Sequence, residues 1–195
     1  MSRRADVTRA TAETDVRVTV DVDGAGRATI STGVGFFDHM LTLLAAHSGF
    51  DLDVEARGDL HTGSHHTVED TGIVLGQALH RALGDRAGIA RYGQALTPMD
   101  ECLAQAAVDV SGRPYLACDV PLPATTIGGF ETDLLSEFLR GMTNHAGITL
   151  HLRLLAGENP HHVIEACFKC VARALRAAVA VDPRQSGVPS TKGTL

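Results

Sequence analysis

One short motif occurs twice in this sequence, and the repeat constrains the fold more than any other feature. The HHxxE motif at 65–69 recurs at 161–165, an offset of 96 positions. The segments that precede the two copies also match, because HSGFDL at 47–52 aligns with HAGITL at 145–150 at an offset of 98. Two matches in the same order predict an internal duplication, in which one structural unit and its copy set the architecture.

Hydrophobic periodicity predicts the order strand, strand, helix, strand, helix in each half. In the first half, valines at 16, 18, 20 and 22 share one face of a strand that a turn at 23–26 joins to RATIS as a hairpin. The remaining elements are expected at 36–50, 50–56, 65–85, 102–112, 113–120, 131–147, 148–156 and 160–181. The predicted fold class is therefore α/β, a two-layer sandwich of two duplicated ββαβα halves. The halves span about 10–90 and 95–185 of one 195-residue domain, and 186–195 form a C-terminal tail.

Composition excludes several classes of function. The chain has 17 Lys and Arg against 23 Asp and Glu, a net charge of −6, with no Trp and two Tyr. Such a chain lacks the clustered positive charge and the aromatic platforms that nucleic-acid binding uses. No apolar run of about 18 residues is present for a membrane span. The N-terminus has no apolar signal segment and the four cysteines are sparse, so a cytoplasmic location is expected.

The repeated motif has the chemistry of a metal site. On a helix, residues three apart share a face, so the second His of each motif is expected to approach the Glu, and the first His points about 100° away. Each motif thus offers one His to one ion and a His with a carboxylate to another. Imidazole and carboxylate ligands suit Mn, Fe, Zn, Co or Ni and argue against Cu(I), and the spacing differs from the HExxH of zinc proteases.

A plainer interpretation is that each His pair caps a helix start, with Glu in the favourable first turn. The second copy favours metal binding, and so does the placement of His39 opposite Glu137 at the offset of 98. His47 and His145 fit either a site or a near-core position. His61, His80 and His151 are expected in loops or on the surface, and the CxxC at 167–170 is expected to be buried thiol packing rather than a redox pair.

Basic residues without a partner motif are the candidates for phosphate binding. Arg91 and Arg113 lie in predicted loops, Lys169 follows Glu165 by one helical turn, and STKG at 190–193 ends the tail. Each alone is an ordinary solvated charge. Gathered around a metal pocket, they would form a cradle for a phosphate group.

Seven segments, in order along the chain, resemble the imidazoleglycerol-phosphate dehydratase family of histidine biosynthesis, in its single-function form without a phosphatase domain. They are FFDHML, HHTVEDTGI, PMDE, VDVSGRPY, NPHHVIEACFK, RALRAAV and GVPSTKG. The resemblance implies self-association into trimers and a 24-subunit shell, with active sites between subunits. It also implies a small phosphorylated imidazole substrate and two Mn²⁺ ions per active site.

Positions that match the family pattern give the expected site residues. The metal ligands would be His39, His65, His66, Glu69, Glu137, His161, His162 and Glu165, with Glu137 standing where many members have His. Substrate contacts would come from Glu13, His39, His47, His65, Glu69, Arg91, Arg113, His161, Lys169, Ser190, Thr191, Lys192 and Gly193.

The expected reaction converts D-erythro-imidazole glycerol phosphate to imidazole acetol phosphate and water. Metal at both ring nitrogens would favour imidazolate, which can expel the adjacent hydroxyl to give a diazafulvene-like intermediate. Loss of the neighbouring C–H proton then gives an enol and finally the ketone. Glu13 and His47 are the candidates to move the protons. The rival functions are another binuclear metalloenzyme, such as a hydrolase, and a non-catalytic metal-binding shell.

Overall fold

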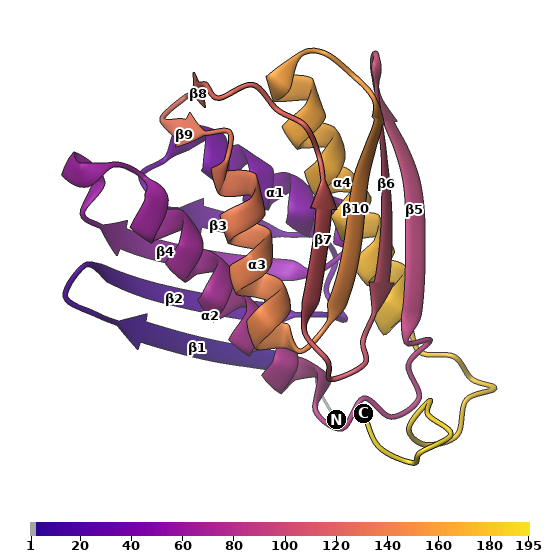
Figure 1. The fold of residues 1–195 in the computed structure, drawn as a ribbon. Coiled ribbons are helices and arrows are strands. Elements are labelled where there is room, and N and C mark those ends of the chain that lie inside the picture. The colour runs from indigo at the N-terminus through magenta and orange to yellow at the C-terminus, as the bar shows by residue number, and fades with distance from the viewer. Residues whose placement is uncertain (1–2) are drawn as a thin grey trace.

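Two four-stranded sheets enclose four helices in a computed structural model that describes residues 3–195 (Figure 1). The first half contains β1 (Arg4–Ala10), β2 (Thr14–Asp21), β3 (Ala28–Ser31), α1 (Gly35–Ser48), β4 (Asp51–Gly58), the short 3-10 helix Leu60–Thr62 and α2 (His65–Leu83). The second half contains β5 (Tyr92–Met99), β6 (Cys102–Asp109), β7 (Tyr115–Asp119), β8 (Thr126–Ile127), β9 (Phe130–Glu131), α3 (Leu134–Ala146), β10 (Thr149–Ala156) and α4 (Pro160–Val179). The α/β class built from two duplicated halves is confirmed.

The strand pairing corrects two details of the predicted halves. The sheets have the orders β1-β2-β4-β3 and β5-β6-β10-β7, so each of these sheets contains one strand more than expected, and the second half adds the short pair β8-β9. The predicted hairpins are wrong, because β3 and β7 pair in parallel with β4 and β10 rather than with the strand before them. The hairpin partners are instead β1 with β2 and β5 with β6.

The missed strands of the two large sheets, β1 and β5, are edge strands, which explains why the sequence pattern did not reveal them. In β1 only Val7 is buried, so no run of alternating apolar residues marks it. The other missed strand, β5, contains Gly93 and Pro98, which are unfavourable inside a sheet but tolerated at its edge. An edge strand has one side without a partner, and its residues therefore need less apolar character.

The helices behave as the periodicity predicted. Helix α1 is capped by Gly49 and α3 by Gly147, each in the left-handed conformation that glycine adopts without strain. Helix α2 ends at Leu83, directly before Gly84. No helix among residues 3–195 is long and apolar enough to cross a membrane.

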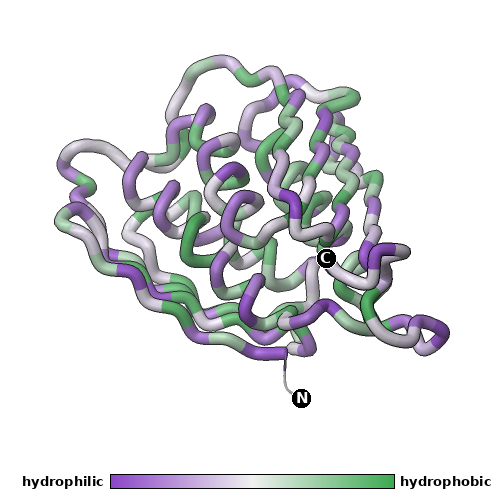
Figure 2. The backbone as a smooth tube through the Cα atoms, turned by 60° about the horizontal axis from the view of Figure 1, so that its bottom comes forward, coloured by the Kyte–Doolittle hydropathy of each residue, from purple (hydrophilic) through white to green (hydrophobic). Residues whose placement is uncertain are grey.

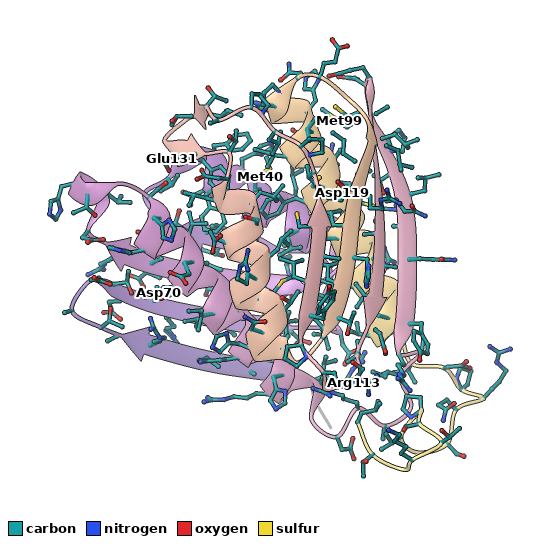
Figure 3. The ribbon with its side chains drawn as sticks, viewed as in Figure 1. Met40, Asp70, Met99, Arg113, Asp119 and Glu131 are labelled. Carbon is teal, nitrogen blue, oxygen red and sulfur yellow. The ribbon has the colours of Figure 1, made fainter. Side chains whose placement is uncertain are left out.

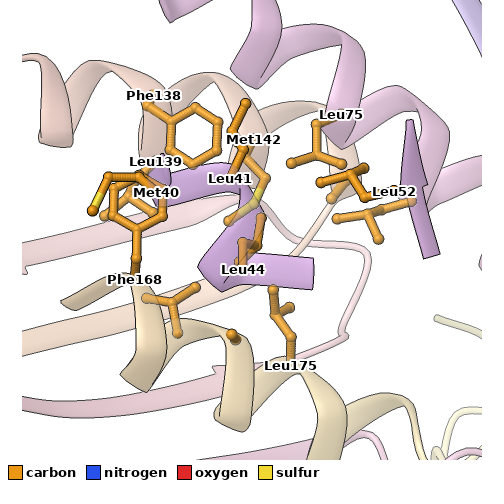
Figure 4. Packing of buried hydrophobic residues seen from close by; sticks show 14 of the residues in the cluster. Met40, Leu41, Leu44, Leu52, Leu75, Phe138, Leu139, Met142, Phe168 and Leu175 are labelled. Atoms are coloured by element: carbon orange, nitrogen blue, oxygen red, sulfur yellow. The ribbon is translucent and has the colours of Figure 1, made fainter. Parts of the chain in front are cut away.

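The core lies between the sheets and is built mostly from helix side chains. Phe138, Met142, Met40, Leu41 and Leu75 are at most 1% exposed and pack together (Figure 4). Each such side chain contributes about 1.5–3 kcal/mol to folding. Along the strands the hydropathy alternates (Figure 2), and Val16, Val18, Val20 and Val22 all point inward, as the sequence predicts.

The helices of the two halves cross in a symmetric way that positions the repeated motifs. Helix α1 packs against α4, and α3 packs against α2, so each helix pair joins the two halves. His39 on α1 therefore faces the second HHxxE copy. Glu137, its counterpart in the repeat, lies on α3, the helix that packs against the first copy's helix, α2.

Candidate metal centre and anion-binding groups

The second HHxxE copy gathers three metal-ligating groups at the start of α4. The Nε2 atoms of His39 and His161 lie 3.5 Å and 3.4 Å from Oε2 of Glu165. The side chain of Asn159 caps the helix by accepting the backbone N–H of His161 at 3.0 Å. The ring of Phe36 packs edge-on against the ring of His161, with 4.9 Å between the two ring centroids. The cap holds the backbone at His161, and the aromatic contact restricts its ring.

Lys169 forms an ion pair with the second carboxylate oxygen of Glu165. Its Nζ lies 2.6 Å from Oε1 of Glu165, one helical turn away, and 3.4 Å from Sδ of Met99. Burial by itself raises the pKa of Glu165, but the hydrogen bond and charge of Lys169 and the nearby His39 outweigh it and lower the pKa. Glu165 is therefore a carboxylate with Oε2 directed at the two imidazoles.

The first HHxxE copy shows that the expected His–Glu pairing was wrong. His65, not His66, lies on the face of Glu69, with 3.8 Å between Nε2 and Oε2. In the second copy it is likewise the first histidine, His161, that approaches the carboxylate. On a helix, side chains four residues apart point within about 40° of each other, whereas side chains three residues apart differ by about 60°. The i,i+4 pair is therefore the closer one. The split into one His–carboxylate pair and one separate His is as expected.

The second histidine of each copy contacts a carboxylate outside the motif. Nδ1 of His66 lies 3.1 Å from both oxygens of Asp59 and 4.0 Å from Oε2 of Glu13. Nδ1 of His162 lies 2.9 Å from Oε2 of Glu101. The hydrogen bonds to Asp59 and Glu101 raise the pKa values of His66 and His162. The bond from His162, followed by one from the Asn159 backbone N–H, lowers the pKa of Glu101 to about 2.

Glu137 lies on α3, which packs against α2 as α1 packs against α4. Its carboxylate is 3.6 Å from Nε of Arg140, one turn along α3. Among residues 3–195, it does not form a compact donor group with His65 and Glu69 of the kind that His39, His161 and Glu165 form. Its role as a ligand stays a prediction.

Arg91, one of the candidate anion-binding groups, lies near the C-terminal end of α4. Nε of Arg91 is 2.8 Å from Asp109, and Nη1 of Arg91 donates to the backbone oxygen of Pro189 at 2.9 Å. Arg113 lies 3.6 Å from the same Asp109 carboxylate. The tail residues Ser190 and Thr191 line a shallow depression with Arg91. This arrangement brings Arg91, Arg113 and the tail together, whereas the cradle hypothesis also requires a metal pocket beside them.

Only Lys169 of the predicted phosphate groups lies near the metal-ligating residues. The backbone N–H of Arg91 donates to Ala178 near the end of α4, 13 residues beyond Glu165, which corresponds to about 20 Å along the helix. Figure 3 shows the same separation, with Met99 and Arg113 at opposite ends of the second sheet. One chain therefore does not bring the two parts of the predicted site together.

The two candidate proton carriers lie in different surroundings. Glu13 precedes β2, and its side chain is 57% exposed beside His66. His47 lies in the last turn of α1, on the side of α4 that carries Lys169 and Arg173. Burial, followed by the charges of these two residues, lowers the pKa of His47. His47 is therefore a neutral imidazole near pH 7.

Comparison with known proteins decides the family. A model of the family described as "Imidazoleglycerol-phosphate dehydratase" matches residues 32–175. The imidazoleglycerol-phosphate dehydratase of Azorhizobium caulinodans is 57% identical over 194 residues, which cover 99% of this chain and 98% of that protein. This chain belongs to the imidazoleglycerol-phosphate dehydratase family. It is accordingly a dehydratase, a hydro-lyase.

Other imidazoleglycerol-phosphate dehydratases agree in sequence and in fold. The protein of Roseobacter denitrificans is 59% identical, over 99% of this chain and 100% of its own. The crystal structure from Staphylococcus aureus matches with a TM-score of 0.83 and 41% identity, over 92% of this chain and 99% of that one. The structure from Pyrococcus furiosus in complex with (S)-C348 matches with a TM-score of 0.84 and 39% identity, over 97% and 100% of the two chains.

Asp59 and Glu101 of this dehydratase fold were not predicted as site residues from the sequence. Neither belongs to a repeated motif, and each contacts its histidine from a different strand end. One signal was available for Glu101, because Glu13 and Glu101 each directly precede an eight-residue strand.

The buried thiols were predicted, and Cys167 and Cys170 are both buried with raised pKa values, chiefly because burial disfavours the thiolate.

Proposed function

We propose that this chain removes water from imidazole glycerol phosphate to give imidazole acetol phosphate, at sites that hold two Mn²⁺ ions and lie between subunits of a homo-oligomer. The observation that carries the proposal is the distance along α4 between the candidate metal ligands and the candidate phosphate-binding groups. One chain presents metal-ligating groups at one end of α4 and anion-binding groups about 20 Å away at the other. A substrate with an imidazole ring and a phosphate a few bonds apart requires the two ends to come from different copies.

The residues at the start of α4 fit a divalent ion. Donors that share one ion through bonds of about 2.0–2.2 Å lie roughly 3.0–3.4 Å apart. The separations from His39 and His161 to Glu165, 3.5 Å and 3.4 Å, are close to that range. Two imidazoles and a carboxylate suit Mn²⁺, although the same set also suits Fe, Zn, Co and Ni. The ligand rings are about half exposed, so there is room for further ligands.

A second ion would be held by the corresponding groups of the first half, which are His65, Glu69 and Glu137. His66 and His162 would each complete a site with Nε2, since their Nδ1 atoms already face carboxylates. When bound, the two ions supply stabilisation of the deprotonated imidazole ring. The same ligand groups, His39, His65, Glu69 and His161, would then contact the substrate ring.

The chain's own acid and base groups would handle the protons. Dehydration needs a proton donor for the departing hydroxyl and a base for the C–H proton. Glu13 is exposed at the start of β2 and free to reach a bound substrate. His47 has a lowered pKa and is suited to accept a proton near pH 7. Both assignments are part of the proposal.

The other end of the chain would hold the phosphate group of a substrate bound to a neighbouring copy. Arg91 and Arg113 offer planar guanidinium groups, and the tail adds Ser190, Thr191, Lys192 and the backbone N–H of Gly193. Lys169 would add a charge from the metal-bearing end. Such a contact between copies also favours the predicted trimers and 24-subunit shell.

Reconstitution of metal-free protein tests the proposal directly. Chelator-treated protein is reloaded with Mn²⁺ and assayed for imidazole acetol phosphate, while light scattering records particle mass. We expect chelation to abolish turnover and reduce the mass, and Mn²⁺ to restore both. Full turnover in protein shown to be metal-free would exclude the metal-dependent mechanism, and an active monomer would exclude shared sites.

A further inference from the structure

The two HHxxE copies differ in the carboxylate that holds their second histidine. Glu13 and Glu101 are equivalent in the duplication, because each directly precedes a strand of eight residues, β2 and β6. Equivalent residues in a duplicated fold are expected to make equivalent contacts. These two glutamates make different contacts with the second histidine of the neighbouring motif.

In the second half, Glu101 holds both the histidine and the helix that bears it. Its Oε2 lies 2.9 Å from Nδ1 of His162, and its Oε1 accepts the backbone N–H of Asn159 at 3.1 Å. Asn159 in turn caps α4 through the backbone N–H of His161. Both oxygens of Glu101 are therefore engaged, and the His162 ring is tied to the start of its own helix.

In the first half, Asp59 takes the place that Glu101 has in the second. Both oxygens of Asp59 lie 3.1 Å from Nδ1 of His66. The backbone N–H of Asp59 donates to the backbone oxygen of Glu13, which keeps the two segments together. The Glu13 carboxylate itself is 4.0 Å from Nδ1, beyond hydrogen-bonding distance, and is 57% exposed.

A bulge in β10 accounts for the exchange. Thr14 pairs with Gly58 in the first sheet, whereas Leu103 pairs with Ala156 after a register shift between Leu154 and Ala156. The shift places Gly157 opposite Cys102, as Gly58 is opposite Thr14, so Glu158 becomes the counterpart of Asp59.

Gly157, which follows the bulge, has a backbone conformation that favours glycine. Its φ is 140°, and a methyl group on it would lie 2.5 Å from Sγ of Cys102. Among the described residues, the carboxylates within 4 Å of Nδ1 of His162 are those of Asp100 and Glu101, and Glu158 is not one of them. The partner of His162 must therefore come from the β6 side.

We propose that Glu101 and Asp59 are the positioning residues of His162 and His66, and that the use of Asp59 leaves Glu13 free to act on the substrate. This inference rests on the proposed function. A carboxylate at Nδ1 holds the proton there and leaves the Nε2 lone pair for a metal ion, the arrangement common around metal-bound histidine. The group formed by Asp100, Glu101 and His162 then serves to orient a ligand and is not a separate metal site.

Manganese affinity of the full-length protein, measured without substrate, tests the inference. Free Mn²⁺ is followed by electron paramagnetic resonance during titration of metal-stripped wild type and variants with MnCl₂. Glu101→Ala and Asp59→Ala should each weaken Mn²⁺ binding about 10- to 100-fold. Glu101→Gln, which keeps a hydrogen-bond acceptor, should show a smaller loss and regain kcat at saturating Mn²⁺.

Two matched variants complete the experiment. Glu158→Ala removes the register counterpart of Asp59 and should leave Mn²⁺ affinity unchanged. Glu13→Gln should also leave affinity unchanged while lowering turnover. Wild-type affinity in both Glu101→Ala and Glu101→Gln would overturn the inference, and if Glu101→Ala fails to fold, Glu101→Gln decides alone. Loss of affinity in these variants, with no dehydration by the Mn²⁺-loaded wild type, would instead reject only the proposed function.

Discussion

At the scale of single residues, Glu13 is the sharpest test of the proposed chemistry. It is exposed, lies outside hydrogen-bonding distance of His66, and has its backbone N–H bonded to the Thr11 hydroxyl. Because it is assigned to proton transfer and not to metal binding, Glu13→Gln should lower kcat by about 10²–10⁴-fold with unchanged metal content. Steady-state kinetics and elemental analysis check the two parts. Wild-type turnover would remove Glu13 from the mechanism and leave His47 as the candidate.

His47 gives a second residue-scale prediction, on pH. Its pKa is lowered, first by burial and then by Lys169 and Arg173. In metal-free protein we expect His47 to titrate below its usual pKa of about 6.5. Between the two values the unfolded chain binds more protons, so this group's contribution to stability is present above pH 6.5 or so and is lost as the pH falls through that window.

Histidine-resolved NMR titration measures this pKa. Arg173→Gln should raise it part of the way, because burial and Lys169 remain, whereas Arg184→Gln, on the distant pair with Asp182, should not change it. Titration of His47 at or above 6.5 in the wild type would contradict the prediction.

At the scale of secondary-structure elements, the α2–α3 contact depends on glycine. A methyl group on Gly72 would lie 2.4 Å from the backbone oxygen of Phe138. Gly to Ala inside a helix normally stabilises by about 0.5–1 kcal/mol. Here the backbones must move apart, and overpacking costs about 1–3 kcal/mol, so Gly72→Ala should lower Tm.

The matched control is Gly35→Ala at the start of α1, where no atom lies within 4 Å of the added methyl group. Its Tm should be unchanged or slightly higher. Thermal unfolding followed by circular dichroism on metal-free protein compares the two variants. An unchanged Tm for Gly72→Ala would show that the helices separate at little cost.

The helices of this fold are predictable from the sequence to a greater extent than the strand pairing. The four helices were predicted, and so were the glycines that end the first three, since periodicity and capping are local properties. The edge strands β1 and β5 were missed because an edge strand needs few apolar residues. The hairpins were wrong because the pairing of β3 with β4, and of β7 with β10, depends on contacts that no local pattern records.

At the scale of the whole molecule, shared sites predict complementation between inactive chains. His161→Ala removes a proposed metal ligand and Arg91→Ala a proposed phosphate contact, so each alone should be nearly inactive. Chains dissociated by chelation, mixed and reassembled with Mn²⁺ should regain activity, up to about a quarter for a two-chain site in a random mixture. A mixture of His161→Ala and Glu165→Ala, both damaged at one end, is the control and should stay inactive. No recovery in the first mixture would place each complete site within one chain.

The sequence by itself determined the duplication, the α/β class, the four helices and the types of donor in the repeated motifs. These follow from residue order, periodicity and side-chain chemistry, which are all local. Helix geometry, which is also local, puts His65 and His161, not His66 and His162, beside the motif carboxylates. Only the tertiary structure decided that Asp59 and Glu101 hold the other two histidines, and that Arg91 and the tail lie at the far end of α4. The physical reason is that a one-residue bulge in β10 and the length of α4 set which side chains meet, and these act between segments far apart in the sequence.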